Sequence, residues 1–115
     1  MPPEANDAAF LQDMAVACDR VPRFIAGKSL EDYRHDDFLR SAVERQVEII
    51  GEVARQVSAA TQTANPQVQW RPIIAQRHIL AHEYGEIEHS LIWKVATVHV
   101  AALRKQLAVI LPPDL

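Results

Sequence analysis

The densest group of chemically reactive side chains is a run of nine residues, Gln76 to Tyr84. It contains an arginine, Arg77, two histidines, His78 and His82, and the tyrosine at its end. A guanidinium group keeps its charge at physiological pH and binds anionic oxygens in a bidentate manner. An imidazole gains and loses a proton near neutral pH, which suits it to acid and base catalysis. The run therefore combines a fixed positive charge with proton carriers, and we take it as the candidate site.

The spacing of these residues limits which of them can act together. On an ideal helix Arg77 and Tyr84, seven residues apart, lie within about 20° of the same face. Arg77 and His82, five apart, diverge by about 140°, so one straight helix cannot direct both side chains into one pocket. They could converge if the helix unwinds near Gly85, or if a second copy of the chain completes the site across a two-fold axis.

The elements that must position this run are predicted to be helices. Residues 8–25 have apolar side chains at every third or fourth position, which indicates an amphipathic helix. Pro22 is expected to kink or end that helix, and Gly27 to close the segment. Ser29 followed by Asp32 then predicts the start of a short helical turn.

A second long helix is predicted to begin at a cap, Asp36 or Asp37, and to run to about Ser58. Residues 60–69 contain Pro66 and no apolar period, so we expect them to form a loop. The inward face of the helix is expected to include one polar residue among its members, which are Leu39, Ala42, Val43, Gln46, Ile50, Val53 and Val57.

The candidate run itself falls on a third helix, which is predicted to start at Pro72 and to end at Tyr84, with Gly85 as its stop. A fourth helix is expected over 86–110, ended by the Pro112-Pro113 pair. Its predicted inward residues are Ile87, Leu91, Val95, Val98, Ala102 and Leu107.

Length and composition are typical of one globular domain. The chain has 115 residues, of which 49% are hydrophobic and 23% charged, enough for one core without disulfides. No period-two pattern of a strand occurs in the sequence. We therefore predict a single domain over 1–115 with an all-α fold, an antiparallel up-and-down bundle of four to five helices.

The same composition excludes several classes of function. A net charge of −3 argues against a broad basic surface for nucleic acid, so any RNA contact should be local. Three glycines are too few for a phosphate-binding glycine loop, and the single Cys18 cannot form an internal disulfide. The longest apolar stretch, 95–103, is interrupted by His99, so no membrane span is predicted. The N-terminus does not resemble a signal peptide, and we expect a cytoplasmic protein.

Arg77, four residues, His82-Glu83-Tyr84 resembles the RX4HXY motif of the HepT-like group within the HEPN superfamily. His78 also agrees, since the residue after the arginine in HEPN proteins is usually asparagine, aspartate or histidine. The resemblance extends over about 38–111. It includes four flanking segments: 42–45, 49–54, 69–74 and 91–93.

This resemblance implies a metal-independent endoribonuclease that acts as the toxin of a toxin–antitoxin pair and works as a homodimer. Arg77 would stabilise the charge that builds up on the phosphoryl oxygens during attack by the neighbouring 2′-hydroxyl. His82 would transfer protons, with His78 assisting orientation. The products would carry a 2′,3′-cyclic phosphate and a 5′-hydroxyl, and no cofactor is implied.

The resemblance also implies a partner, a minimal nucleotidyltransferase that serves as antitoxin. It would transfer AMP to the motif tyrosine, which is Tyr84 here. An adenylate attached beside Arg77 would add negative charge and bulk where the substrate phosphate must bind, and so would inhibit the nuclease.

Ordinary structural explanations stand beside each of these assignments. Arg77 could be a surface arginine paired with a carboxylate, and His82 an interface histidine bonded to a backbone carbonyl. Tyr84 could pack its ring at a helix end. His78 and His82, four residues apart with Glu86 on the same ridge, could in principle bind zinc, but no third ligand is fixed and we predict no metal site.

Glu52 lies in a helical stripe with Arg45 and Glu48, for which intrahelical ion pairs are the simplest explanation. A supporting role, in which Glu52 orients Arg77 or a histidine, is the alternative. At the level of the whole chain the competing function is a noncatalytic helical dimer that binds a nucleotidyltransferase partner or a nucleotide.

Overall fold

The computed structural model describes the backbone of residues 5–82 and 86–111, and the side chains of 6–76 and 89–111. The described part consists of helices and their connections, with no β-strand. In order along the chain the elements are α1 (Ala5–Ile25), α2 (Leu30–His35), α3 (Asp37–Gln56), α4 (Ala59–Ala64), α5 (Trp70–His82), α6 (Glu86–Lys94), the π-helical segment η1 (Val95–His99) and α7 (Val100–Ile110).

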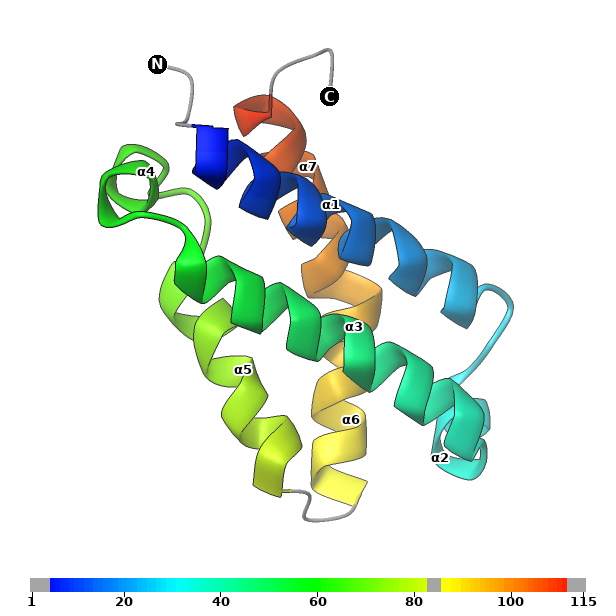
Figure 1. Cartoon of the computed structure of the whole chain (residues 1–115). Helices are drawn as coiled ribbons and strands as arrows, with labels where there is room; N and C mark the ends of the chain where they lie inside the picture. The colour runs from blue at the N-terminus through cyan, green and yellow to red at the C-terminus, as the bar shows by residue number, and fades with distance from the viewer. Residues whose placement is uncertain (1–4, 83–85, 112–115) are drawn as a thin grey trace.

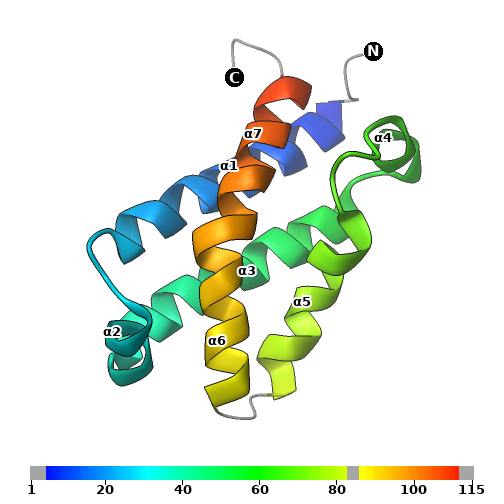
Figure 2. The same ribbon diagram turned by 180° about the vertical axis from the view of Figure 1, so that it is seen from behind.

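The long helices form two antiparallel pairs that cross each other (Figure 1). One pair is α1 with α3, and the other is α5 with the continuous rod α6–η1–α7. Seen from behind, the rod passes over both α1 and α3, and α5 lies beside its lower half (Figure 2). α1 packs on α3 and α7, and α3 packs on α5. The predicted all-α helical bundle is thereby confirmed.

The helix ends agree with the capping residues that the sequence offers. Gly27 has a φ of 73°, the left-handed conformation that ends α1. The Ser29 hydroxyl accepts from the amide of Asp32 at 3.1 Å, and the Ser29 amide donates to the Asp32 carboxylate at 2.8 Å. Asp36 caps α3 by accepting from the Leu39 amide at 3.0 Å. The two alternatives for this cap are thus resolved in favour of Asp36.

Pro22 does not end α1, contrary to one of the two predicted outcomes. The helix continues through it to Ile25. Pro22 is exposed, whereas its neighbour Val21 is fully buried and Phe24 and Ile25 pack against the core. Packing of this last turn outweighs the backbone hydrogen bond that proline removes.

The loop predicted over 60–69 is wrong in its first half, because a short helix, α4, occupies residues 59–64. Polar contacts stabilise this helix in place of an apolar face. The Ser58 hydroxyl accepts from the Thr61 amide at 3.2 Å. The carboxylate of Asp7 accepts from the Ser58 amide, the Ser58 hydroxyl and the Thr61 hydroxyl at 2.9, 2.5 and 2.6 Å. A periodicity analysis cannot detect a helix of this kind.

The inward face predicted for the second long helix is largely confirmed on α3. Its polar member, Gln46, is buried and accepts a hydrogen bond from Arg20 of α1 at 3.5 Å. Leu39, Val43, Ile50 and Val57 are buried, while Ala42 and Val53 are half-buried.

The inward face predicted for the last helix is mostly wrong. Leu91 and Val98 are 45% and 53% exposed, and Ala102 is also exposed. Val95 is half-buried, Leu107 is buried as predicted, and the side chain of Ile87 lies outside the described residues. The rod carries two apolar stripes, and the one that faces the core is Ile92, Ala96, Val100, Leu103 and Leu107.

The π-helical segment η1 explains part of this error. The sequence predicted one uninterrupted helix, but residues 95–99 follow the wider π geometry. The core positions Ile92, Ala96 and Val100 are four residues apart, and Ala96 lies within this segment. No helix in the described part of the chain is long and apolar enough to cross a membrane.

Candidate active site

The structure places the first half of the candidate site on a continuous helix. Arg77, His78 and His82 lie in the second half of α5, whose backbone is helical throughout 70–82. The side chains of these three residues, and Tyr84 with the expected stop at Gly85, lie outside the described residues. The roles assigned to them therefore remain predictions.

The helical backbone of α5 keeps Arg77 and His82 on different sides of the helix, as the sequence spacing predicted. The helix does not unwind between Arg77 and His82, so these two positions lie about 140° apart around its axis. Of the two routes to a common pocket, unwinding near Gly85 concerns residues outside the described part. Completion of the site by a second copy is compatible with α5 as described.

The first half of α5 is firmly anchored and so determines where the motif lies. Trp70 is only 7% exposed, and its indole nitrogen donates to the carbonyl of Asn65 at 3.0 Å. Ile73, one turn further, is buried in the core, and α5 packs along α3. Trp70 thus anchors the start of α5 in the core. The helix begins at Trp70, two residues before the predicted Pro72.

Glu52 lies on α3, and its side chain is 41% exposed. Its carboxylate is 3.5 Å from the guanidinium of Arg55. Arg45 and Glu48 also form an ion pair, with Nη1 of Arg45 2.5 Å from Oε1 of Glu48. Local ion pairs are thus present along this stripe, as the simplest explanation predicted, although the partner of Glu52 is Arg55, which lies outside the predicted stripe. The supporting role of Glu52 remains a proposal.

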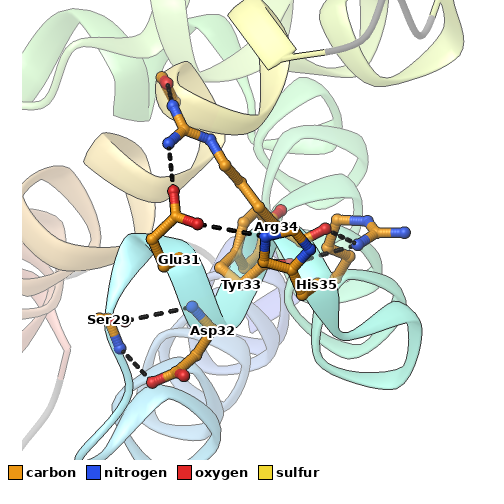
Figure 3. Close-up of polar contacts among 8 residues, drawn as sticks. Ser29, Glu31, Asp32, Tyr33, Arg34 and His35 are labelled. Carbon is orange, nitrogen blue, oxygen red and sulfur yellow. Dashed lines mark hydrogen bonds and ion pairs between the residues drawn. The ribbon is translucent and has the colours of Figure 1, made fainter.

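A second element, α2, packs against α6, the first helix of the rod, which follows the motif in the chain. Tyr33 is fully buried and meets the His89 ring edge-on at 6.1 Å and the Trp93 ring at 5.4 Å. Next to it, Arg34 donates to the Ser90 hydroxyl at 3.1 Å (Figure 3). α6 begins only four residues after α5 ends. These contacts therefore help to hold the helix that follows the motif in place.

The sequence pattern did not predict this contact between α2 and α6. Burial raises the pKa of Tyr33 well above its ordinary value, so the phenol is neutral throughout the physiological range. Its hydroxyl has no hydrogen-bond partner among the described residues. The capping signal at Ser29 located α2, but nothing in the pattern indicated that Tyr33 would reach the start of α6. The sequence position of His89 likewise gives no sign of its contact with Tyr33.

A groove of about 350 Å³ runs between α5 and the rod, beside the motif. Gln76, which directly precedes Arg77, lines it, as do Pro72 and Ile73 from the same helix. Among the rod residues whose side chains are described, its ionisable lining residues are Lys94 and His99. The groove is therefore mainly apolar, and it borders the half of α5 that carries the motif.

The described residues contain no group of three histidine, cysteine or carboxylate side chains that could hold a metal ion. The pair considered for zinc, His78 and His82 with Glu86 on the same ridge, lies outside the described side chains. This alternative is therefore untested by the geometry.

The structure thus places Arg77 and His82, the first two members of the RX4HXY pattern, on helix α5 of an all-α bundle, and comparison with known proteins specifies the family. A family model described as "Ribonuclease HepT-like" matches residues 14–110. The chain therefore belongs to the HepT-like ribonuclease family. The match begins well before residue 38, where the resemblance recognised in the sequence began. The predicted enzyme class, a ribonuclease, is thereby confirmed.

Relatives with similar lengths support this assignment. The chain is 29% identical over 102 residues to "Putative RNase MJ1380" of Methanocaldococcus jannaschii, covering 89% of this chain and 94% of that protein. It is 29% identical over 105 residues to "Putative RNase TTE0752" of Caldanaerobacter subterraneus, covering 91% and 94%. It is 27% identical over 95 residues to "Probable ribonuclease HepT" of Thermococcus cleftensis, covering 83% and 86%. No solved structure matches the chain.

Proposed function

We propose that this protein is the toxin of a HEPN toxin–antitoxin pair and that it cleaves RNA internally without a metal ion. The observation that carries the proposal is the placement of Arg77 and His82, with the RX4HXY spacing, on one well-anchored helix of a HepT-like bundle. The substrate is RNA, and the proposed location is the cytoplasm.

The proposed reaction uses the RNA's own 2′-hydroxyl as nucleophile. The 2′-oxygen forms a bond to phosphorus while the bond from phosphorus to the 5′-oxygen breaks. Arg77 stabilises the negative charge on the non-bridging oxygens, and His82 transfers the proton that this exchange requires. His78 assists orientation, and Glu52 is the proposed supporting carboxylate. The products are a 2′,3′-cyclic phosphate and a 5′-hydroxyl, so neither water nor a metal-bound nucleophile is needed in this step.

The active unit is proposed to be a homodimer. The positions of Arg77 and His82 lie about 140° apart around α5, which supports a site completed by a second helix. A two-fold axis supplies a second copy of the same helix. Each site would then take its arginine from one copy and its histidine from the other.

Control of the enzyme is proposed to act through Tyr84. A cognate minimal nucleotidyltransferase would attach AMP to this tyrosine through a phosphodiester bond. The added phosphate would compete for Arg77, and the nucleotide would occupy the space of the substrate. The modified protein would therefore be inactive without unfolding.

Substitution of the two main residues tests this function. Arg77→Ala should lower the rate of RNA cleavage by about 100-fold or more, as loss of a charge-stabilising donor typically does. His82→Ala should lower it by a similar or larger factor, within about 100- to 10,000-fold. Both variants should also lose toxicity to growing cells.

Arg71→Ala is the matched control, because Arg71 is an exposed arginine in the first turn of the same helix. Its cleavage rate should stay near that of the wild type. Equal rates for Arg77→Ala, His82→Ala and Arg71→Ala would show that the motif is not the catalytic machinery.

A further inference from the structure

The π-helical segment η1 turns two polar side chains of the rod toward the groove. At its end the Val100 amide donates to the carbonyl of Val95, five residues earlier. Side chains five positions apart diverge by about 140° on a regular α-helix, but they come closer to one side where the helix bonds at this longer interval. Lys94 and His99 have this spacing across η1, and both line the groove between α5 and the rod. The π geometry thus explains how an ammonium group and an imidazole reach the same groove.

The groove combines apolar walls with a few polar groups. Ile73 of α5 and Val95 and Leu103 of the rod are among its apolar lining residues. Gln106 also lines it, and its amide nitrogen donates to the carbonyl of Gln67 at 3.0 Å. This bond fixes the amide and leaves its oxygen able to accept. A volume of about 350 Å³ with mainly apolar walls and a small number of placed polar groups is typical of a site for a small molecule or a single group of a larger one.

The groove adjoins the proposed catalytic arginine. Gln76 lines it, and Arg77 is the next residue of the same helix. Gln69, directly before α5, also lines it, so the groove follows α5 for about 10 Å at 1.5 Å per residue. Figure 2 shows α5 beside the rod along this length. An RNA strand whose scissile phosphate binds at Arg77 would therefore have a neighbouring nucleotide beside the groove.

We propose that the groove is a subsite for one unpaired nucleotide of the RNA, the neighbour of the phosphate that is cleaved. Its base lies against the apolar walls, the amide of Gln76 and the imidazole of His99 bind the edge of the base, and Lys94 binds the backbone phosphate. Proteins commonly recognise RNA in this way, by holding an unstacked base and bonding its edges. The inference rests on the proposed function for the substrate, RNA, and goes beyond it by naming where the strand binds and which residues hold it.

A nucleotide matches the groove because both combine the same two kinds of surface. A base has flat apolar faces and polar edges, and it is attached to a phosphate that carries a negative charge. The groove has apolar walls with amides among them, and the ammonium group of Lys94, an exposed residue, lies on its lining. Opposite charges and matching apolar faces therefore favour this occupant.

Two adjacent alanines on α7 provide the first test. Both are exposed, but Ala102 lines the groove and Ala101 does not. The probe is a pool of single-stranded hexanucleotides of mixed sequence with 2′-O-methyl groups, which bind without being cleaved because the nucleophile is blocked. Ala102→Glu should raise the dissociation constant of the probe by about 10-fold or more, because a carboxylate in the groove repels the phosphate. Ala101→Glu, with the same added charge, should bind nearly as the wild type does.

Two exposed lysines of the rod provide the second test. Lys94 lines the groove, whereas Lys105 lies outside its lining. A lysine that binds a phosphate of a single strand contributes about 0.7 to the slope of log affinity against log salt concentration. Lys94→Gln should therefore make this slope shallower by about 0.7, and Lys105→Gln should leave it unchanged.

Equal dissociation constants for Ala102→Glu and Ala101→Glu, an unchanged salt slope for Lys94→Gln, or no binding of the probe by the wild type would overturn the subsite. Light scattering adds a further check, since a change of oligomeric mass in Ala102→Glu would assign the groove to a protein contact and overturn the subsite as well. The proposed function fails separately. A wild type that binds the probe through the groove but leaves ordinary RNA uncut would keep the subsite and refute the nuclease.

Discussion

At the scale of single residues, one buried carboxylate connects the N-terminal helix to the corner between α3 and α4. Asp7 is 3% exposed and accepts three hydrogen bonds, two from Ser58 and one from Thr61. Burial alone would raise the pKa of Asp7, but the hydrogen bonds from Ser58 and Thr61 outweigh it and hold the pKa below its ordinary value.

Asp7→Ala should destabilise the protein by about 1–3 kcal/mol, because it leaves the donors of Ser58 and Thr61 without their acceptor. A group whose pKa is lowered by folding contributes stability above its unfolded pKa and loses it as the pH falls through the folded pKa. The difference between wild type and Asp7→Ala should therefore be full at pH 7 and shrink below about pH 4. Urea unfolding at several pH values measures it.

The control for this prediction is Asp13→Ala, since Asp13 is an exposed aspartate on the same helix. Its free energy of unfolding should change by less than about 0.5 kcal/mol. An Asp7→Ala variant as stable as Asp13→Ala would show that the contacts of Asp7 contribute nothing net.

At the scale of elements, the sequence predicted the helices well where a cap or a buried face defines them. Asp36 and the buried Gln46 on α3 are two examples. It failed where two faces of one helix were equally apolar, as on the rod, because periodicity shows that a stripe exists but not what covers it. It also failed for α4, whose stability depends on the distant Asp7.

Pro22 gives a prediction at this scale. Because α1 continues through this exposed proline, Pro22→Ala should restore a missing backbone hydrogen bond without disturbing the core. The free energy of unfolding should rise by about 1–3 kcal/mol. Arg23→Ala, at the next exposed position, should leave it within about 0.5 kcal/mol. Thermal unfolding of both variants and of the wild type measures these differences. A Pro22→Ala variant less stable than wild type would contradict the account of α1.

At the scale of the whole molecule, the candidate site could be recognised from its motif, whereas its completion could not. The spacing of Arg77 and His82 predicted the candidate residues, and the helical backbone of α5 preserves the angle between their positions. The proposed second helix would come from an interface between two copies, and the sequence of one chain does not display such an interface.

A mixture of two inactive variants tests whether each site is shared between copies. If Arg77 of one chain works with His82 of the other, a mixed dimer of Arg77→Ala and His82→Ala chains has one intact site. Random exchange of subunits makes half of the dimers mixed, so the mixture should recover about a quarter of the wild-type cleavage rate. Two Arg77→Ala preparations mixed in the same way should recover none. No recovery in the mixed dimers would place both residues of a site in one chain.

The most direct measurement is the cleavage of RNA by the unmodified wild-type protein in the presence of EDTA, with the chemistry of the product ends determined. Intact mass should first show that Tyr84 carries no adenylate. The account predicts cleavage that EDTA does not slow, with 2′,3′-cyclic phosphate and 5′-hydroxyl ends. Cleavage abolished by EDTA, or products with a 5′-phosphate, would contradict a metal-independent attack by the 2′-hydroxyl.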